Sequence, residues 1–209
     1  MALSFPTSLP DYEDIQEMRI SSLSATSRTL SPYTFHAQAQ ANAGDVFVFR
    51  FALRPMQKDD AAPWIAFIKA LRGGANTCLV GDPHRRSPLG SAATAPGSPL
   101  VAGASQTGTS LAIDGCPANA TGYLLAGDWI QLGTGSDSRI YMVMEDASTN
   151  GSGAVTLTIS PSLRASPADN AAVTVSNTVC ACRLLNPNVE WSVNKEHWHE
   201  IDLEFIESI

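Results

Sequence analysis

A single amphipathic helix in a chain that otherwise has the patterns of strands constrains this fold more than any other feature. The helical segment, Asp59 to Gly74, has the sequence DDAAPWIAFIKALRGG. Its apolar side chains recur at the i, i+3, i+4, i+7 spacing of one helix face, and these are Trp64, Phe67, Ile68 and Leu71. We expect Asp59 or Asp60 to cap the first turn, and Gly73 and Gly74 to end the helix. The apolar stripe requires a sheet to cover it.

The segments on either side of the helix have the patterns of strands. Val46 to Leu53 alternates and is rich in β-branched and aromatic residues, and a short apolar run, Cys78 to Val80, follows the helix. Trp198 to Ile206 alternates apolar residues with acids, which predicts a half-buried strand with an acidic outer face. We expect the helix to face the sheet that these strands form. Residues 1–40 have no clean period and are interpreted as mostly extended or irregular.

The composition changes abruptly after Arg86. No ionisable residue occurs between Arg86 and Asp114, and the segment is rich in Ser, Gly, Ala and Pro. We interpret Pro88 to Pro99 as a linker. Short apolar runs separated by closely spaced turn residues follow, and they predict a small barrel or sandwich.

The patterns of the first part return from Val179 onward. The sequence therefore predicts a mainly β protein in which one domain is inserted into another. Residues 1–90 and 179–209 are expected to form a discontinuous β-sandwich with one α-helix. Residues 95–178 are expected to form an inserted, peripheral β domain.

The charge of the chain argues against a role in holding nucleic acid. The formal net charge is −7, whereas proteins that bind nucleic acids concentrate Lys and Arg on one face. The basic doublet of Arg85 and Arg86 is interpreted as a solvated turn. No apolar run approaches the roughly 20 residues that span a bilayer, and the first residues lack the pattern of a signal peptide. We therefore predict no membrane insertion.

The residues that could carry chemistry do not form a recognisable site. His197 and His199 would point to one face of a strand, flanked by Glu196 and Glu200, but no third ligand is indicated. We favour an interface or surface pair over a metal site. No nucleophile elbow, P-loop or dinucleotide motif occurs. We expect no catalytic, cofactor-binding or metal-binding residues, no cofactor and no enzymatic activity.

The cysteines have neither the spacing of a zinc site nor the pattern of a disulfide framework. Cys180 and Cys182 would lie on the same face of a strand, which is a poor geometry for a bridge between them. We predict that all four are reduced and buried in a protein made in a cytoplasm, and they are Cys78, Cys116, Cys180 and Cys182.

Several segments together resemble the distal tail proteins of long-tailed (siphophage-type) bacteriophages and related prophage tail particles. The segments are DVFVFRFALRPM, APWIAFIKALRGGANTCLVGDP, LLAGDWIQLG, VTLTISPSLRASPADNAAV and HEIDLEFIES. The resemblance covers the chain from about residue 44 to its end. It rests on turns and apolar strands rather than on catalytic signatures.

The resemblance implies a structural component of the virion. It implies a β-sandwich with one helix that assembles as a hexameric ring at the end of the tail tube, and a galectin-like, OB-like or barrel-like domain that points outward. The ring would join the tube protein to the tip hub or baseplate, dock receptor-binding or fibre proteins, and pass DNA through its lumen. The protein would be made in the bacterial host cytoplasm and reside in the tail tip. An acidic lumen would not retain phosphates.

Two other functions stay open. A carbohydrate-binding module that attaches the particle to the host surface would need aromatic stacking platforms, which Trp129, Trp191, Trp198, Tyr123 or Tyr141 could supply. Trp129 lies in an apolar strand and is predicted to be a core residue instead. A capsid or tail-completion protein that does not occupy the tube end is the third interpretation.

Overall fold

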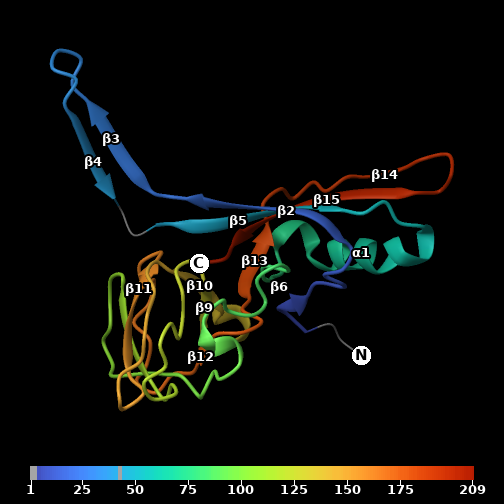
Figure 1. Ribbon diagram of the computed structural model, residues 1–209. Coiled ribbons are helices and arrows are strands. Elements are labelled where there is room, and N and C mark those ends of the chain that lie inside the picture. The colour runs from blue at the N-terminus through green and yellow to red at the C-terminus, as the bar shows by residue number, and fades with distance from the viewer. Residues whose placement is uncertain (1–3, 42–43) are drawn as a thin grey trace.

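The computed structural model describes residues 4–41 and 44–209 and is mainly β, with strands in 37% of the chain and helices in 11%. The mainly β prediction is therefore confirmed. The α-helix is α1 (Lys58–Ala70), and the short 3-10 helices are Arg72–Gly74, Ser91–Ala93 and Gly135–Asp137 (Figure 1). The strands are β1 (Thr7–Ser8), β2 (Ile15–Leu23), β3 (Thr26–Leu30), β4 (Ala37–Ala41), β5 (Val46–Leu53), β6 (Cys78–Val80), β7 (Leu100–Val101), β8 (Ser110–Asp114), β9 (Trp129–Leu132), β10 (Arg139–Val143), β11 (Val155–Ser160), β12 (Val173–Thr174), β13 (Cys180–Leu184), β14 (Trp191–Val193) and β15 (His199–Glu207).

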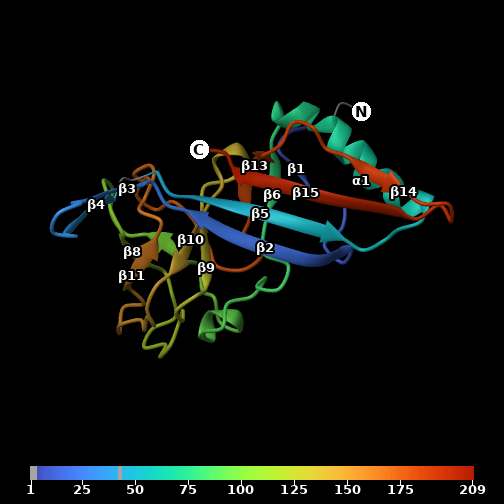
Figure 2. The same ribbon diagram turned by 90° about the horizontal axis from the view of Figure 1, so that it is seen from above.

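Strands from both ends of the sequence form one large sheet. Its order is β1-β6-β13-β15-β5-β2, and β14 pairs with β15. Figure 2 shows β15, β5 and β2 side by side. In the antiparallel pair of β15 and β5, Phe205 lies opposite Phe49 and Leu203 lies opposite Phe51. The expected pairing of the strand before the helix with the final strand is confirmed.

The helix packs on this sheet as its apolar stripe predicts. Trp64, Phe67, Ile68 and Leu71 are all buried in the core that the sheet and helix share. The ring of Phe67 lies between the helix and the sheet, with its centroid 6.0 Å from that of Trp64 and 6.4 Å from that of Phe205 on β15. The periodic pattern therefore identified the buried face correctly.

The expected start of the helix is wrong. The helix begins at Lys58 after Gln57, which makes no side-chain cap, so Asp59 and Asp60 lie in the first turn. The backbone of Met56, two residues before the helix, exchanges two hydrogen bonds with that of His199 on β15, at 3.0 and 2.8 Å. Asp59 and Asp60 still stabilise the helix, because their negative charges lie near the positive end of the helix dipole.

The expected end of the helix is confirmed only for its left-handed glycines, because α1 ends at Ala70 and Gly73 and Gly74 follow it in a short 3-10 turn. Gly73 and Gly74 have φ angles of 65° and 92°, the left-handed region that glycine adopts at little cost. Arg72 also has a positive φ, 49°. The side chain of Asn76 donates to the carbonyl of Ala70 at 2.8 Å, which satisfies one of the last carbonyls of the helix.

The second sheet is barrel-like and nearly closed. Its order is β12-β9-β10-β11-β8-β7, so all its strands come from the middle of the sequence. Its two ends meet where Leu100 forms a bridge with Ala172 and the Val173 N–H donates to the Pro99 carbonyl at 3.0 Å. The barrel interior holds a second apolar core that includes Leu111, Ile113, Tyr123, Ile130, Tyr141, Val143 and Leu157. The short strands that the turn spacing predicts are present.

The segment from Pro88 to Pro99 does not behave as a linker, and that interpretation is wrong. The buried carboxylate of Asp128 accepts hydrogen bonds from the N–H groups of Leu89 at 2.7 Å, Gly90 at 3.3 Å and Leu125 at 2.8 Å. Ala92 is fully buried in the barrel core. These contacts hold the segment against the barrel.

The leading residues are also more regular than expected. β2 pairs with β5 along its whole length and β3 pairs with β4, so residues 15–41 and 44–53 belong to one long ribbon that changes direction between β2 and β3 (Figure 1). The β3–β4 part extends away from the rest of the molecule (Figure 1). The interpretation of residues 1–40 as mostly extended or irregular therefore holds as extended chain in this ribbon, and the regular pairing of its strands was not predicted. β2 lacks clean alternation because Gln16 creates a register shift between Ile15 and Glu17.

The barrel-like sheet packs directly on the large sheet. Trp129 and Ile140 of the barrel belong to the same buried cluster as the helix and β5. This shared cluster joins the two parts. The predicted domain boundaries remain a prediction. In the described residues, no helix is long and apolar enough to cross a lipid bilayer.

Candidate interaction surfaces

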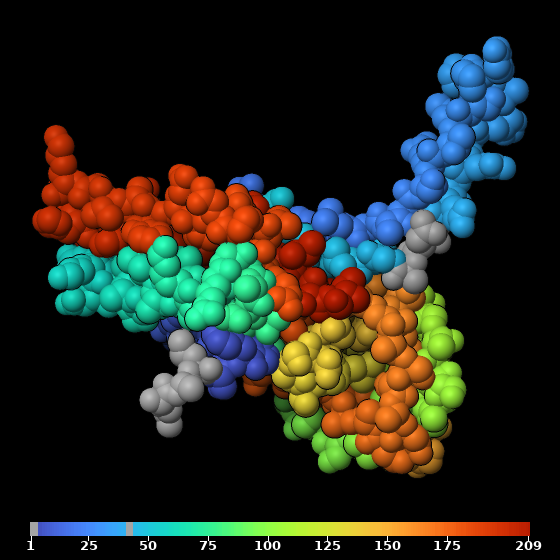
Figure 3. Space-filling view, turned by 180° about the vertical axis from the view of Figure 1, so that it is seen from behind, coloured from blue at the N-terminus to red at the C-terminus, as the bar shows by residue number. Residues whose placement is uncertain are grey.

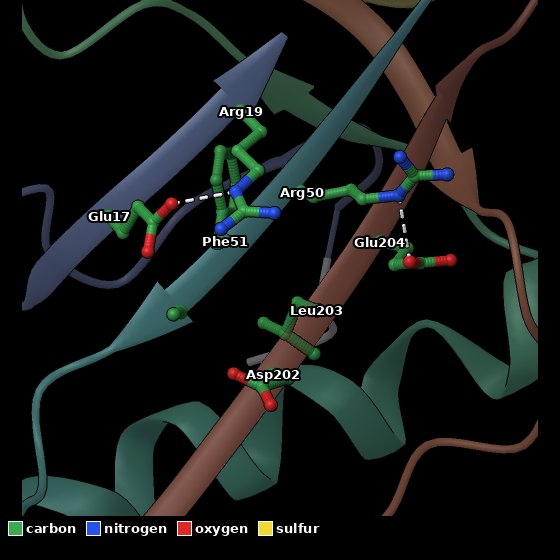
Figure 4. A pocket seen from close by; sticks show the side chains of 8 residues that line it. Glu17, Arg19, Arg50, Phe51, Asp202, Leu203 and Glu204 are labelled. Atoms are coloured by element: carbon green, nitrogen blue, oxygen red, sulfur yellow. Dashed lines mark hydrogen bonds and ion pairs between the residues drawn. The ribbon is translucent and has the colours of Figure 1, made fainter. Parts of the chain in front are cut away.

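A shallow groove of about 260 Å³ lies on the solvent-facing side of the large sheet, over β2, β5 and β15 (Figure 4). Arg50 stands opposite Glu204, and its Nε donates to the carboxylate of Glu204 at 2.8 Å. Arg19 donates through Nε to Glu17 at 2.6 Å. Because Arg19 and Arg50 also lie directly opposite each other, these carboxylates offset a repulsion between like charges.

The charged side chains of the groove do not include one suited to act as a general acid and another suited to act as a general base. The paired side chains are between 43% and 72% exposed, and Glu17 raises the pKa of Arg19 through its hydrogen bond and its charge. A guanidinium that stays protonated cannot act as a base near neutral pH. Within residues 4–41 and 44–209, no three His, Cys, Asp or Glu side chains lie close enough together to hold a metal ion. The absence of enzymatic activity remains a prediction.

The two C-terminal histidines do not share a strand face, so that expectation is wrong. His197 lies in the β14–β15 turn with a φ of 67°, and His199 is the first residue of β15. The side-chain oxygen of Asn194 accepts hydrogen bonds from the N–H groups of Glu196 and Trp198, both at 2.9 Å. This turn chemistry places His197 outside the strand.

The aromatic side chains of the barrel are core residues rather than exposed platforms. Tyr123, Tyr141 and Trp129 are 0%, 2% and 4% exposed. The ring of Trp129 packs edge-on against Phe47, with a centroid distance of 5.1 Å, which confirms that it is a core residue. Carbohydrate binding remains a prediction, and these three side chains cannot supply its stacking surface.

The four cysteines are buried and unbridged, as expected. Cys180 and Cys182 lie on one face of β13 with their sulfur atoms 3.3 Å apart. Burial raises the pKa of the Cys78 thiol, and burial together with a hydrogen bond to Cys180 raises that of Cys182. A thiol held in its protonated form is a poor nucleophile, so these residues act as small core side chains.

One exposed surface is the projecting hairpin of residues 26–41, which we call the arm. Every described side chain from Thr26 to Gln40 is exposed except Ser31, which is half-buried. At its tip, Tyr33 is 92% exposed and Phe35 is 75% exposed. Large apolar side chains so free of contacts are characteristic of surfaces that become covered in an assembly.

A second surface lies at the other end of the large sheet, in the hairpin of residues 189–202, which we call the acidic end. It contains four carboxylates against one lysine, and the carboxylates are the exposed Glu190, Glu196, Glu200 and Asp202. Val193 is 51% exposed, and Trp191 and Trp198 are half-buried. The acidic outer face that the alternation of this segment predicts is therefore present.

The sequence patterns did not predict the arm. The alternating segment AQAQA is a weak strand signal, and Pro32 lies in a stretch of turn residues between it and TSRTL. An apolar tip, PYTF, between two polar strands was the available signal for an exposed hairpin. It was weak because a short two-stranded ribbon has no buried face to impose a clear period.

Comparison with known proteins does not assign the chain to a family. A scan against protein-family models finds no match, and a search of curated proteins finds none either.

Proposed function

We propose that this protein is a structural component of a bacteriophage tail or a related prophage tail particle. It forms a ring at the distal end of the tail tube, joins the tube to the tip hub or baseplate, and docks receptor-binding or fibre proteins. The large sheet with its helix acts as the ring-forming half of a split β-sandwich. The barrel-like sheet is the peripheral domain, of a galectin-like or OB-like kind.

The observation that carries the proposal is the arm. Four of the ten large apolar side chains that are exposed in the described residues lie in a window of 13 residues at the arm and its base, namely Leu23, Leu30, Tyr33 and Phe35. A chain that acted alone would gain nothing from exposing them, whereas an assembly subunit would bury them on its neighbours. The segments that resemble distal tail proteins supply the kind of assembly.

The charge of the chain supports the same role. The net charge of −7 disfavours retention of DNA that passes through a lumen. The groove on the outer face of the large sheet carries ion pairs rather than a free basic patch. The proposed location is the tail tip of the virion, and the proposed ring number of six comes from the resemblance.

The test is assembly in the presence of the neighbouring tail proteins. The full chain is mixed with a phage tail tube protein, and the mass of the product is measured. A ring of this chain at one end of the tube, seen by electron microscopy with a label on the chain, is the expected result. A chain that stays monomeric at high concentration and also with tube protein present would overturn the proposal. Binding of the full chain to host polysaccharide without any assembly would favour the carbohydrate-binding alternative.

A further inference from the structure

We propose that the arm of one copy binds the acidic end of a second copy, so that subunits associate head to tail. The inference rests on the proposed ring and names the contact that builds it. The occupant of each surface is the other surface on a neighbouring chain. Such a contact is heterologous, and it closes into a ring when the rotation between successive copies permits.

The two surfaces lie at opposite ends of the molecule. The arm leaves one end of the large sheet, and the β14–β15 hairpin forms the other end, in all three overall views (Figures 1, 2 and 3). The arm therefore cannot reach the acidic end of its own chain. The two surfaces can meet only between different copies.

The arm presents an ordered apolar tip. The Ser31 N–H donates to the His36 carbonyl and the Phe35 N–H donates to the Ser31 carbonyl, both at 3.0 Å. Phe35 has a φ of 55°, a conformation that a bulky residue adopts at a cost and that structures often retain at functional positions. A tip held in one conformation loses less entropy when it binds.

The charges of the two surfaces are complementary. The sequence has no carboxylate between Glu17 and Asp45, so the arm carries Arg28 and His36 without any acid. The acidic end carries its four carboxylates against one lysine. The first turn of α1 lies beside it, because Met56 pairs with His199, and this turn adds Asp59 and Asp60 against Lys58.

The apolar parts of the two surfaces match as well. Val193 and the half-buried rings of Trp191 and Trp198 lie among the acids of the acidic end. Tyr33 and Phe35 on the arm are aromatic side chains of the kind that is enriched at the centres of protein interfaces. An aromatic contact surrounded by opposite charges favours a second copy of this chain over a partner that carries an acidic surface but no apolar patch.

The experiment uses two variants of the full chain, each altered at one end. The arm variant carries Tyr33→Ser and Phe35→Ser, and the end variant carries Val193→Ser with Glu196→Arg and Glu200→Arg. All five side chains are exposed, so both variants should fold. Sedimentation velocity at chain concentrations up to about 1 mM, where weak contacts are populated, measures the association of each. We expect the wild-type chain to form larger oligomers and each variant alone to be monomeric.

A mixture of the two variants gives the sharpest readout. The arm variant keeps an intact acidic end, and the end variant keeps an intact arm, so one productive contact remains between them. We expect the equimolar mixture to form dimers and nothing larger. A symmetric contact between two arms would instead let the end variant, which keeps its arm, form dimers by itself without the arm variant.

A charge reversal tests the same contact independently. Arg28→Glu alone, and Glu196→Arg with Glu200→Arg alone, should each weaken association by about tenfold or more. The three changes combined in one chain should restore most of it, because reversed arms then meet reversed ends. A control for the arm variant is Leu89→Ser with Met144→Ser, which removes two apolar side chains that are 59% and 51% exposed and lie outside both surfaces; it should not change association.

Three results would overturn the proposal. Oligomers that persist in both variants would show that copies associate through other surfaces, and the proposed ring would survive that result. A wild-type chain that stays monomeric at about 1 mM, or an arm variant that assembles normally on the tube protein, would show that the arm does not bind a second copy. The proposed ring is tested separately, by the experiment that measures assembly of the chain with the tail tube protein.

Discussion

Arg164, which follows the barrel strand β11, forms a buried ion pair with Glu207 on β15 of the large sheet. The side chains are 5% and 0% exposed, and Arg164 Nη2 lies 2.7 Å from Glu207 Oε2. The same Nη2 donates to the Asp45 carbonyl at 2.8 Å, and the Phe47 N–H donates to Glu207. Burial raises the pKa of Glu207, while the charge and hydrogen bonds of Arg164 lower it. This pair fastens the barrel to the large sheet.

Removal of one partner should destabilise the protein strongly. Arg164→Met leaves the Glu207 carboxylate buried without its cation, and such changes cost about 3–5 kcal/mol. The double variant Arg164→Met with Glu207→Met should recover much of that loss, because no buried charge remains. Urea unfolding measures both. Arg50→Gln is the control, since its partly exposed pair with Glu204 should contribute less than about 1 kcal/mol. Equal losses for Arg164→Met and Arg50→Gln would mean that the buried pair does not fasten the barrel to the large sheet.

The helix is tied to the first strands by the carboxylate of Asp14. This side chain is 8% exposed and accepts a hydrogen bond from the indole Nε1 of the fully buried Trp64 at 2.8 Å. Asp14→Ala should lower the free energy of unfolding by about 1–3 kcal/mol, because the indole N–H loses its acceptor. A Trp64→Phe background tests the cause, since Asp14→Ala should then have a smaller effect. An unchanged effect in that background would mean that the bond to Trp64 is unimportant.

Phe67→Asp should prevent folding. Phe67 is 7% exposed and its ring contacts Trp64 and Phe205, so a carboxylate there would be buried without a partner. Circular dichroism and solubility report the outcome. Phe67→Leu keeps an apolar side chain at the same position and should fold with a smaller loss of stability. A soluble Phe67→Asp chain that assembles normally would show that the core has been misplaced.

The hydrogen bonds that Asp128 accepts should hold residues 88–99 in place against the barrel. Asp128→Ala removes the acceptor of three backbone N–H groups, which should cost about 3 kcal/mol and expose this segment to proteases. Limited proteolysis with mapped cleavage sites gives the readout. Asp146→Ala is the control, because this exposed side chain accepts one backbone N–H, from Ala126 at 2.9 Å. Resistance of the Asp128→Ala variant to cleavage would show that other contacts hold the segment in place.

Stability should fall at alkaline pH. Burial raises the pKa of Cys78 and Cys182, and of Tyr12, Tyr123 and Tyr141. Above about pH 8.5 the unfolded thiols release protons that the folded ones retain, so rising pH favours the unfolded chain by up to about 1.4 kcal/mol per pH unit for each such group. The stabilisation is complete below the unfolded pKa and is lost as the pH rises toward the folded value.

Urea unfolding under reducing conditions from about pH 7 to pH 10 measures this loss. Cys182→Ala removes one of the buried thiols, so its unfolding free energy should fall less steeply between about pH 8.5 and 10 than that of the wild type. The comparison uses slopes, because the substitution also changes packing. A flat profile for the wild type would show that these thiols and phenols are not protected from ionisation in the folded protein.

The elements with a local pattern can be predicted from the amino-acid sequence. The stripe from Trp64 to Leu71 set the buried face of the helix, and the alternation in Val46–Leu53 and in the final strand set which side chains face the core. These patterns are readable because side chains three, four or two residues apart share a face whatever the rest of the chain does.

How these elements are joined depends on contacts between residues far apart in the sequence. Asp14 meets Trp64 across 50 residues, Asp128 orders Leu89 and Gly90, and Arg164 meets Glu207 across 43 residues. No local period records such partners, because a buried polar group takes whichever acceptor the folded chain brings within hydrogen-bond distance. The arm was missed for a related reason: all of its described side chains from Thr26 to Gln40 except Ser31 are exposed, so no buried face marks them in the sequence.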